Sequence, residues 1–412
     1  DRLDLGALGD GGGLGALALR PFGLAAGELL GVLLALGGDA DLVVEPWIAP
    51  YRDRARLGLF QKLWVRRLGP AAGWPAGVLP AVLRRRFGIV AEAEIGAVLD
   101  ASGFRYTDDD RHGARSAREL ATNAGRWRRA GKEVILLPQA LGPFRTRAVR
   151  EPFRRALDDV ALVYARDPVS EAHLRELLPG DDRVRRSPDF TIGLAGRPPG
   201  DLEALVGRGP FACIVPNDRM LERTEASIAS RYIAFLEAVS HELTVIGLRP
   251  VLVLHETARD APFADRLRPA LGPEPRVVAA ADPLLLKGLL GAATIVVSSR
   301  YHALISALSQ GVPVVATGWS HKYATLLTAF GCPAQLIDVR ASGDELRAVL
   351  AVASDGPARA AMIATLHERT AAQCGEVDRM WLEIRQRLGL PGRVKLPPLA
   401  ASRPTRIVAG AR

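Results

Sequence analysis

The feature that most constrains the fold is the alternation of short, continuous apolar runs with longer helix-length segments. Strands without polar alternation are buried on both faces, and helical connections make neighbouring strands parallel. The runs predicted as strands are Leu42–Glu45, Ala97–Asp100, Val134–Pro138, Ala161–Ala165, Ala212–Pro216, Val251–His255, Arg276–Val278, Thr294–Ser298, Val312–Thr317 and Gln335–Asp338. The predicted helices include Ala114–Ala130, Thr146–Asp159, Val169–Leu178, Ile228–Ile246, Pro283–Gly291, Ala303–Gln310 and Pro357–Leu388.

The strands fall into two sets, which predict two Rossmann-like domains that face a cleft. A chain of 412 residues is long for a single core, and the Pro- and Gly-rich stretch 193–209 separates the sets. We expect an N-terminal, acceptor-side domain over 1–195 and a C-terminal, donor-side domain over 196–356. A C-terminal helix over 357–390 and a flexible basic tail over 391–412 follow. Ligands of such domains bind at the carboxyl ends of strands, so functional residues are expected there.

Charge, cysteine spacing and one apolar stretch argue against a nucleic-acid partner, a metal site and a membrane span. The formal net charge is +9, but no motif that recognises nucleic acid accompanies it, so no nucleic-acid partner is expected. The three cysteines lie far apart, without CxxC or metal-ligand spacing, and predict reduced thiols rather than a metal site. The apolar stretch 21–38 is interrupted by Glu28 and by several glycines, and it predicts a buried helix rather than a membrane span.

The segment Ser298–Lys322 is the strongest candidate for an anion site. Arg300 and His302 directly follow a predicted strand and precede a helix that starts near Ala303. A helix N-terminus favours an anion, and the arginine guanidinium matches carboxylate or phosphate. The next strand is followed in the same way by His321 and Lys322. Two consecutive βα units therefore predict one pocket that holds a negatively charged substrate.

The alternative is that Arg300 and Lys322 are solvated charges at helix starts. Positive charge is unfavourable at a helix N-terminus unless an anion compensates it, so the repeated arrangement favours the anion site. For His321 alone, the two interpretations have equal weight.

Further candidates follow strands of the first domain. Arg166 comes after the strand Ala161–Ala165, where it either binds an anion or forms an ion pair with Asp167. Gln139 follows another strand and is suited to binding an acceptor hydroxyl. Asp100 is either a base or hydroxyl-binding group, or the cap of a turn.

One segment carries a mixture of basic and apolar residues. Gln61–Gly88 has six Lys or Arg residues, no acidic residue, and two tryptophans among other apolar side chains. Such a mixture is typical of contact with anionic lipid headgroups. An ordinary helix pair with a solvated basic face is the favoured interpretation.

An ordered set of short motifs resembles the polysaccharide pyruvyl transferase family. Its pieces are Asp100–Phe104, Pro138–Phe144, Ala165–Pro168, Ser187–Phe190, Val215–Asn217 and Ser298–Gly331. The resemblance implies a GT-B-like α/β fold and transfer of pyruvate from phosphoenolpyruvate to a sugar, which forms a cyclic ketal. It also implies that Arg166, Arg300 and His302 bind the donor. The Gly-Asn-x-Gly-Asp-like turn typical of the family's N-terminus is not evident.

The residues suit that chemistry. Phosphoenolpyruvate carries about three negative charges near neutral pH, so its site needs several cations. Its C3 carbon must be protonated, for which His302 is the candidate general acid. Arg300, Arg166 and Lys322 are expected to stabilise the departing phosphate, with His321 as a further donor-side residue. Asp100, Gln139 and Asn217 are the acceptor-side candidates. No metal or redox cofactor is expected.

Two other functions stay open on the sequence. A GT-B glycosyltransferase that uses a nucleoside-diphosphate sugar also needs cations, but it usually has an acidic residue for the donor ribose, which 319–331 lacks. A non-catalytic carbohydrate-binding relative is the third possibility. The expected location is cytoplasmic, with peripheral contact at the inner membrane face, and the saccharide acceptor is either lipid-linked or a finished polymer.

Overall fold

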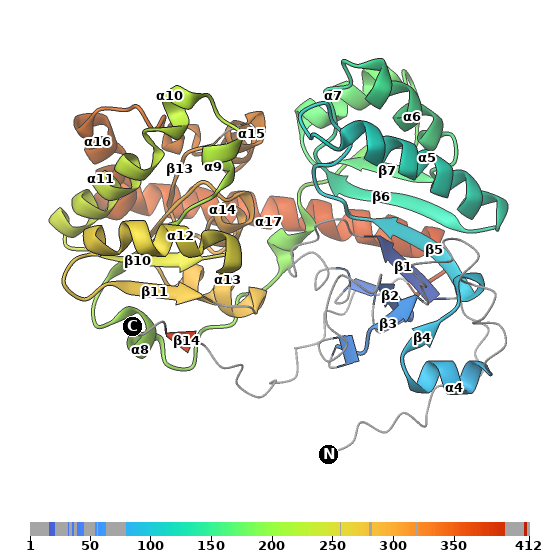
Figure 1. The fold of residues 1–412 in the computed structure, drawn as a ribbon, viewed down its shortest axis with the longest axis horizontal. Coiled ribbons are helices and arrows are strands. Elements are labelled where there is room, and N and C mark those ends of the chain that lie inside the picture. Colours follow the sequence, from blue (N-terminus) through green and yellow to red (C-terminus); the bar gives the residue numbers. More distant parts are fainter. Residues whose placement is uncertain are drawn as a thin grey trace. The chain divides into compact units, whose positions relative to one another are not determined.

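The structure is a computed structural model in which the chain divides into two compact units (Figure 1). Unit 1 comprises Asp1–Ser187 with Asp378–Pro397, and unit 2 comprises Pro188–Val377 with Pro398–Arg412. The described residues are 16–20, 32, 35–36, 39–44, 54–55, 57–62, 80–255, 257–279, 282–318, 320–391 and 408–409.

Unit 1 is built on an eight-stranded parallel sheet. The strand order is β4-β3-β2-β1-β5-β6-β7-β8, with parallel pairing at each step. The strands are β1 (Ala16–Arg20), β2 (Leu42–Val44), β3 (Phe60–Lys62), β4 (Ile89–Val90), β5 (Ile95–Asp100), β6 (Glu133–Gln139), β7 (Leu162–Ala165) and β8 (Val184–Arg186).

Alternation along the strands buries both faces of this sheet. Val163 and Ala165 of β7 join one core with α5 (Gly113–Arg129), α6 (Arg147–Leu157) and α7 (Pro168–Leu177), which lie on one face (Figure 1). Tyr164 lies between them in sequence, so its side chain points to the other face. There its hydroxyl donates to Glu383 at 2.6 Å, near the end of α17 (Gly356–Arg387).

Unit 2 has a parallel sheet in the order β13-β12-β9-β10-β11, with the two-residue β14 antiparallel at its edge. Its strands are β9 (Phe211–Val215), β10 (Arg249–Leu254), β11 (Arg276–Ala279), β12 (Ile295–Ser298), β13 (Val314–Ala316) and β14 (Val408–Ala409). The helices around it are α11 (Tyr232–Val245), α12 (Thr257–Leu267), α13 (Pro283–Gly291), α14 (Tyr301–Leu308), α15 (His321–Ala329) and α16 (Gly343–Ser354).

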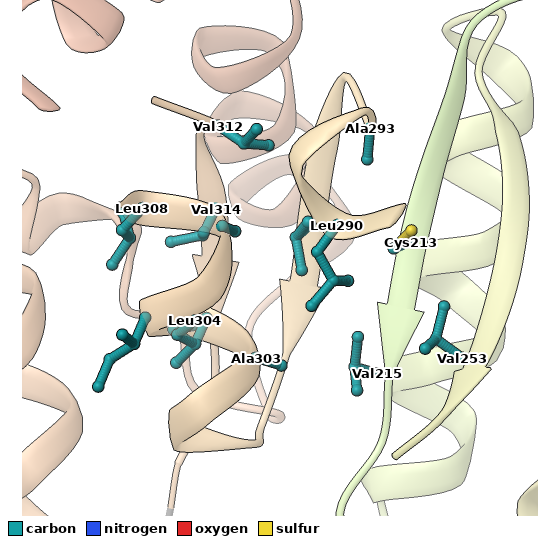
Figure 2. Packing of buried hydrophobic residues seen from close by; sticks show 14 of the residues in the cluster. Cys213, Val215, Val253, Leu290, Ala293, Ala303, Leu304, Leu308, Val312 and Val314 are labelled. Atoms are coloured by element: carbon teal, nitrogen blue, oxygen red, sulfur yellow. The ribbon is translucent and has the colours of Figure 1, made fainter. Parts of the chain in front are cut away.

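Successive residues of β9 separate two cores in unit 2. Cys213 and Val215 pack with α13, α14 and α15, and Figure 2 shows part of this layer around Leu290 and Leu304. Ala212 and Ile214 pack on the opposite face with α11, α12 and α16. β9 is therefore covered on both sides, as a continuous apolar strand requires.

In both sheets the order in which the chain adds strands reverses at an inner strand. In unit 2 the chain proceeds from β9 through β10 to β11, then crosses to β12 and β13 on the other side of β9. In unit 1 it proceeds from β1 through β2 and β3 to β4, then crosses to β5. Ligands of doubly wound sheets bind outside the carboxyl ends of the strands that flank such a switch. The relevant pairs are β9 with β12 in unit 2, and β1 with β5 in unit 1.

Short elements connect these layers. They are α4 (Ala81–Arg86), α8 (Leu202–Val206), α9 (Arg219–Glu222), α10 (Ala226–Ala229) and the 3-10 helices η2 (Glu92–Glu94), η3 (Phe190–Gly193), η4 (Arg268–Leu271) and η5 (Pro333–Gln335). Helix starts follow local capping chemistry. Asp167 and Asp282 cap α7 and α13 through their carboxylates, each with proline at the first helical position.

The predicted strands are confirmed, with one exception. Gln335–Asp338 is not a strand, because Pro333 opens η5 and only the isolated bridge between Ala316 and Leu336 forms. The sequence pattern missed β1, β3, β4 and β8, which are short or lack a β-branched run. The helix predicted in 21–38 lies mostly outside the described residues, although Val32, Ala35 and Leu36 are described and buried.

The units divide at Ser187–Pro188, earlier than the predicted boundary at 195–196. The difference arises because η3 packs on unit 2, where Lys287 Nζ donates to the carbonyl oxygens of Thr191 and Ile192 at 2.9 and 3.3 Å. Helix α17 begins in unit 2, and its residues from Asp378 belong to unit 1. The tail predicted at 391–412 lies almost wholly outside the described residues.

The basic segment Gln61–Gly88 is not an ordinary helix pair in its described parts. Lys62 lies in β3 and forms an ion pair with Glu92 at 2.7 Å, while Arg84 of α4 is buried against Glu94. The acids lie just beyond the segment, so its own residues do not reveal them. Residues 63–79, including Trp64 and Trp74, lie outside the described residues. Within the described ranges, no single helix has the length and apolar character needed to cross a membrane, and only the bent pair α16–α17 passes that test jointly.

A glycine in α13 tests how closely the chain packs beside this helix. A Cβ atom on Gly288 would lie 2.0 Å from the carbonyl oxygen of Arg197, whereas one on Gly193 would meet nothing within 4 Å. We predict that Gly288→Ala lowers the free energy of unfolding by about 1–3 kcal/mol, although alanine favours helix. Gly193→Ala is the control and should be nearly neutral. Chemical denaturation measures both, and equal stability of the two variants would contradict the prediction.

Candidate active site

The turn after β12 is fixed by hydrogen bonds with β9, with the loop that follows β9, and with α15. Ser298 Oγ donates to the Val215 carbonyl oxygen of β9 at 3.1 Å and accepts from the Arg300 amide at 2.9 Å. The Ser299 carbonyl oxygen accepts from Asn217 Nδ2 at 2.8 Å and from the Tyr323 hydroxyl at 2.7 Å. The turn therefore sits rigidly at the switch point between β9 and β12.

Asn217 has a structural role in this arrangement. Its Oδ1 accepts from the Arg219 amide at 3.1 Å, while its Nδ2 holds Ser299. The side chain is buried, so the acceptor contact predicted for Asn217 requires a ligand to approach a group that already stabilises the turn. That contact stays a prediction.

Arg300 is buried at the start of α14, and acidic groups of the chain surround its guanidinium. Its Nε donates to the Pro216 carbonyl oxygen at 2.9 Å. Its Nη2 pairs with the fully buried Asp260 of α12, and Asp218 Oδ1 lies 3.8 Å away. The alternative of a solvated charge is therefore wrong for Arg300. The anion that compensates this cation in the structure is supplied by the protein.

His302 lies in the first turn of α14, which begins two residues before the predicted start near Ala303. Its side chain is 30% exposed, and its Nε2 lies 3.6 Å from Oδ2 of the buried Asp189. The Tyr301 ring meets the imidazole edge-on at 5.7 Å between centroids. His302 is thus a partly accessible titratable group beside the buried Arg300.

The second βα unit brings Lys322 to the same place. Lys322 Nζ lies 5.5 Å from the centroid of the Tyr301 ring and 5.4 Å from that of Tyr323, within the range of cation–π attraction. The structure therefore gathers Arg300, His302 and Lys322 around Tyr301. His321 is the first residue of α15, and its Nε2 is buried without a hydrogen-bond partner among the described residues.

His255 adds a group that the sequence analysis did not select. It directly follows β10, the neighbour of β9, and its Nδ1 is buried without a hydrogen-bond partner in the described part of the chain. Burial lowers the pKa of His255 to about 3, with further lowering from the charges of Arg300 and His302. His255 is therefore a neutral imidazole beside the two proposed donor-binding residues.

The candidates of unit 1, the acceptor-side Asp100 and Gln139 and the donor-side Arg166, follow adjacent strands. Asp100 ends β5 at the switch point, where its carboxylate accepts from the Ser102 amide at 3.0 Å and the Tyr106 hydroxyl at 2.7 Å. Gln139 ends β6, and its Nε2 donates to the Asp100 carbonyl oxygen at 3.4 Å. The amide of Arg166, just after β7, donates to the Gln139 carbonyl oxygen at 3.1 Å. The three residues thus lie together at one edge of the sheet.

Local hydrogen bonds bear on the alternatives given for Asp100 and for Arg166 with Asp167. Asp100 does hold a turn, as its capping alternative predicted, and it remains a candidate for hydroxyl binding. The carboxylate of Asp167 accepts from the amide and hydroxyl of Ser170 at 2.8 and 2.9 Å, so its bonds cap α7. Gln139 Oε1 is buried with no hydrogen-bond partner among the described residues.

Three site residues escaped the sequence analysis for different reasons. His255 has the same position after a strand as Arg300, so the rule applied to Arg300 also selects it. Asp189 lies in the Ser187–Phe190 motif, but the motif by itself assigned it no role. Asp260 lies inside a helix, and no local signal marks it. Among the described residues, no group of three or more His, Cys, Asp or Glu side chains is arranged to hold a metal ion.

The Arg300–Asp260 pair predicts a measurable coupling. Asp260→Ala leaves a buried guanidinium without its main counter-charge, so we expect the free energy of unfolding to fall by about 3–5 kcal/mol. The double variant Asp260→Ala, Arg300→Met should recover part of this loss, because it removes both charges. Denaturant titration of the single and double variants measures the coupling. Full stability of Asp260→Ala would contradict it.

Solved structures similar to this chain share the GT-B architecture. The Anabaena HepE complex with UDP and glucose aligns at a TM-score of 0.57 and 14% identity, covering 91% of this chain and 99% of that one. The S. aureus MnaA–UDP structure aligns at 0.59 and 12% identity, covering 92% and 98%. The UDP-GlcNAc 2-epimerase from Neisseria meningitidis aligns at 0.55 and 11% identity, covering 90% and 99%. At these identities the likeness establishes the fold, and it confirms the α/β, GT-B-like fold class.

Sequence comparison establishes the family. No curated protein matches the chain significantly. The family model for polysaccharide pyruvyl transferase matches residues 38–321, well over half of the chain, and includes Asp100, Gln139, Arg166, Arg300 and His302. The chain belongs to the polysaccharide pyruvyl transferase family.

Proposed function

We propose that the protein transfers a pyruvyl group from phosphoenolpyruvate to a sugar of a cell-surface or extracellular polysaccharide, or its precursor, and forms a cyclic ketal. The observation that carries this proposal is the gathering of Arg300, His302 and Lys322 at the switch between β9 and β12. The site combines two cations for an anionic donor with one accessible group that can deliver a proton. Family membership supports the same reaction.

The proposed reaction begins with proton transfer from His302 to C3 of the donor, which makes C2 electrophilic. One sugar hydroxyl then forms a bond to C2, and its proton returns to the imidazole. The bond between C2 and the phosphate oxygen breaks, and a second hydroxyl closes the ketal. Of the two hydroxyl protons, one is in effect transferred to the new methyl group through His302. The other leaves with phosphate.

The cations have different proposed roles because their surroundings differ. Lys322 is held by two aromatic rings, so its ammonium is suited to the departing phosphate. Arg300 is already oriented by Pro216 and Asp260, so it offers a preorganised guanidinium at the cost of a competing carboxylate. We assign Arg166 and His321 to the donor as well. Asp100, Gln139 and Asn217 are the proposed acceptor contacts, and no cofactor is assigned.

Phosphate release tests the reaction directly. Purified protein is incubated with phosphoenolpyruvate and a panel of saccharide acceptors, including lipid-linked ones. We expect acceptor-dependent release of phosphate, which falls by roughly 100-fold or more in His302→Gln because the general acid is lost. Lys322→Met should also fall. His241→Gln, a change at an exposed histidine away from these residues, is the matched control and should retain activity.

Arg300 needs a more conservative change, because its removal leaves the buried Asp260 without its counter-charge. Arg300→Lys keeps a positive charge but loses the planar fork, so we expect lower activity in a folded protein. Turnover of nucleoside-diphosphate sugars with none of phosphoenolpyruvate would instead support the glycosyltransferase alternative. Saccharide binding without turnover of either donor would support the non-catalytic alternative.

We further propose a cytoplasmic protein that touches the inner membrane face through an exposed surface on α4. This α4 patch consists of Val82, Leu83, Arg85, Arg86 and Phe87. Val82 is 83% exposed and Phe87 is 53% exposed, which is unusual for neighbouring apolar side chains. Arg85 and Arg86 are exposed beside them. Apolar groups flanked by arginines complement an anionic lipid surface, where the ring enters the interface and the cations meet the headgroups.

Vesicle sedimentation tests the α4 patch. We expect binding to vesicles that contain phosphatidylglycerol and much weaker binding to pure phosphatidylcholine. Each arginine near the surface contributes about 1 kcal/mol, so Arg85→Gln with Arg86→Gln should lower partitioning by roughly tenfold or more. Val82→Ser with Phe87→Ser should also lower it. Val245→Ser removes an apolar residue that is 63% exposed in unit 2 and serves as the control. Equal binding of all variants would refute the proposed contact.

A further inference from the structure

Asp189 is a buried carboxylate whose position is fixed by its own turn. It caps η3, where its Oδ1 accepts from the Thr191 amide at 3.0 Å and from the Thr191 hydroxyl at 2.6 Å. The same turn is attached to α13, because Lys287 donates to the Thr191 and Ile192 carbonyl oxygens. The carboxylate therefore has little freedom to rotate.

The second oxygen of this carboxylate faces the imidazole of the accessible histidine. Asp189 Oδ2 lies 3.6 Å from His302 Nε2. That distance is longer than a hydrogen bond but within ion-pair range when the imidazole is protonated, and catalytic contacts of this kind are often long in ligand-free sites. His302 is 30% exposed, whereas Asp189 is 3% exposed. One nitrogen of the ring thus faces a buried negative charge while part of the ring stays open to a ligand.

We propose that Asp189 is the positioning residue for His302: it holds the Nε2 edge of the ring, favours the imidazolium form, and leaves Nδ1–H to protonate the donor. This role rests on the proposed function. Asp189 does not itself give up or take a proton. After His302 has protonated C3, the neutral imidazole recovers a proton from the attacking hydroxyl, and the ionised carboxylate again stabilises the charged form.

Among the described residues, the other charges around His302 do not supply this stabilisation. Arg300 disfavours a second cation, but Asp260 and Asp218 compensate it. His255 is neutral, and Lys322, which lies 5.5 Å from the centroid of the Tyr301 ring, adds positive charge. Lys287 lies behind Asp189, and burial lowers its pKa to about 8, against the raising effect of Asp189. Among the described residues, Asp189 is the carboxylate within ion-pair distance of His302.

The first test measures the imidazole directly and needs no substrate. The chain has seven histidines, so NMR titration of labelled histidine is practicable, with His302→Gln to assign the signal. We expect Asp189→Asn to move the titration of His302 to lower pH by about one unit, because a nearby opposite charge favours the charged form. Asp338→Asn, which removes an exposed carboxylate of unit 2, is the matched control and should leave the titration unchanged.

A second variant gives an independent test that stays informative if Asp189→Asn fails to fold. Lys287→Met removes the positive charge behind Asp189 while keeping a side chain of similar length. It should move the His302 titration in the opposite direction, to higher pH, because Asp189 then acts on the imidazole alone. A titration that neither variant moves would overturn the proposal.

The pH dependence of phosphate release separates positioning from a structural role. A general acid must be protonated, so kcat/KM falls as pH rises through the titration of His302. In Asp189→Asn this alkaline limb should move to lower pH by the same amount as the NMR titration. A uniform loss at all pH values, with the limb unmoved, would indicate a structural role only. If the wild-type protein releases no phosphate while the NMR shift persists, the proposed function fails and the Asp189–His302 interaction stands.

Discussion

The buried contact between Arg300 and Asp260 is the interaction on which the candidate site depends. Arg300 follows β12, Asp260 lies in α12 after β10, and the Pro216 carbonyl that also binds the guanidinium follows β9. One side chain therefore joins the carboxyl ends of three neighbouring strands. A charge pair without solvent is stable only when its remaining hydrogen bonds are satisfied. The turn after β9 supplies the Pro216 carbonyl oxygen for the guanidinium, and the turn after β12 carries Arg300 itself. Both turns are thereby held in place.

The same constraint sets the electrostatics of the site. With Arg300 largely compensated, His302 and Lys322 are the partly exposed groups of this set. His302 lies beside Asp189, and Lys322 lies near the rings of Tyr301 and Tyr323. In the proposed reaction, a trianionic donor meets a site whose positive charge is concentrated in few, well-oriented groups. Preorganised charges of this kind favour a transition state that develops negative charge, because they need no reorientation as that charge forms.

Particular residues show which parts of the site and fold could be predicted from the sequence. The position after a buried parallel strand selected five residues. The structure puts Gln139 at the end of β6, Arg166 directly after β7, and Arg300, His302 and Lys322 at or just inside the helices that follow β12 and β13. The same pattern missed β1 and β8, which carry too few apolar β-branched residues to stand out. It missed Asp260 because a helix-borne acid has no local signature. It missed the role of Asp189 because an Asp-containing turn has the same sequence whether it caps a helix or faces a histidine.

The sequence by itself determined the fold class and the family, because apolar periodicity and motif order are properties of the chain alone. It also determined which strand ends carry cations. Tertiary structure decided how those cations are used. Asp260 lies 40 residues before Arg300, and Asp189 lies far from His302 in sequence, so only folding brings each acid to its partner. Burial then sets the strength of these charge interactions, because an interaction that is slight in water becomes strong where solvent is excluded.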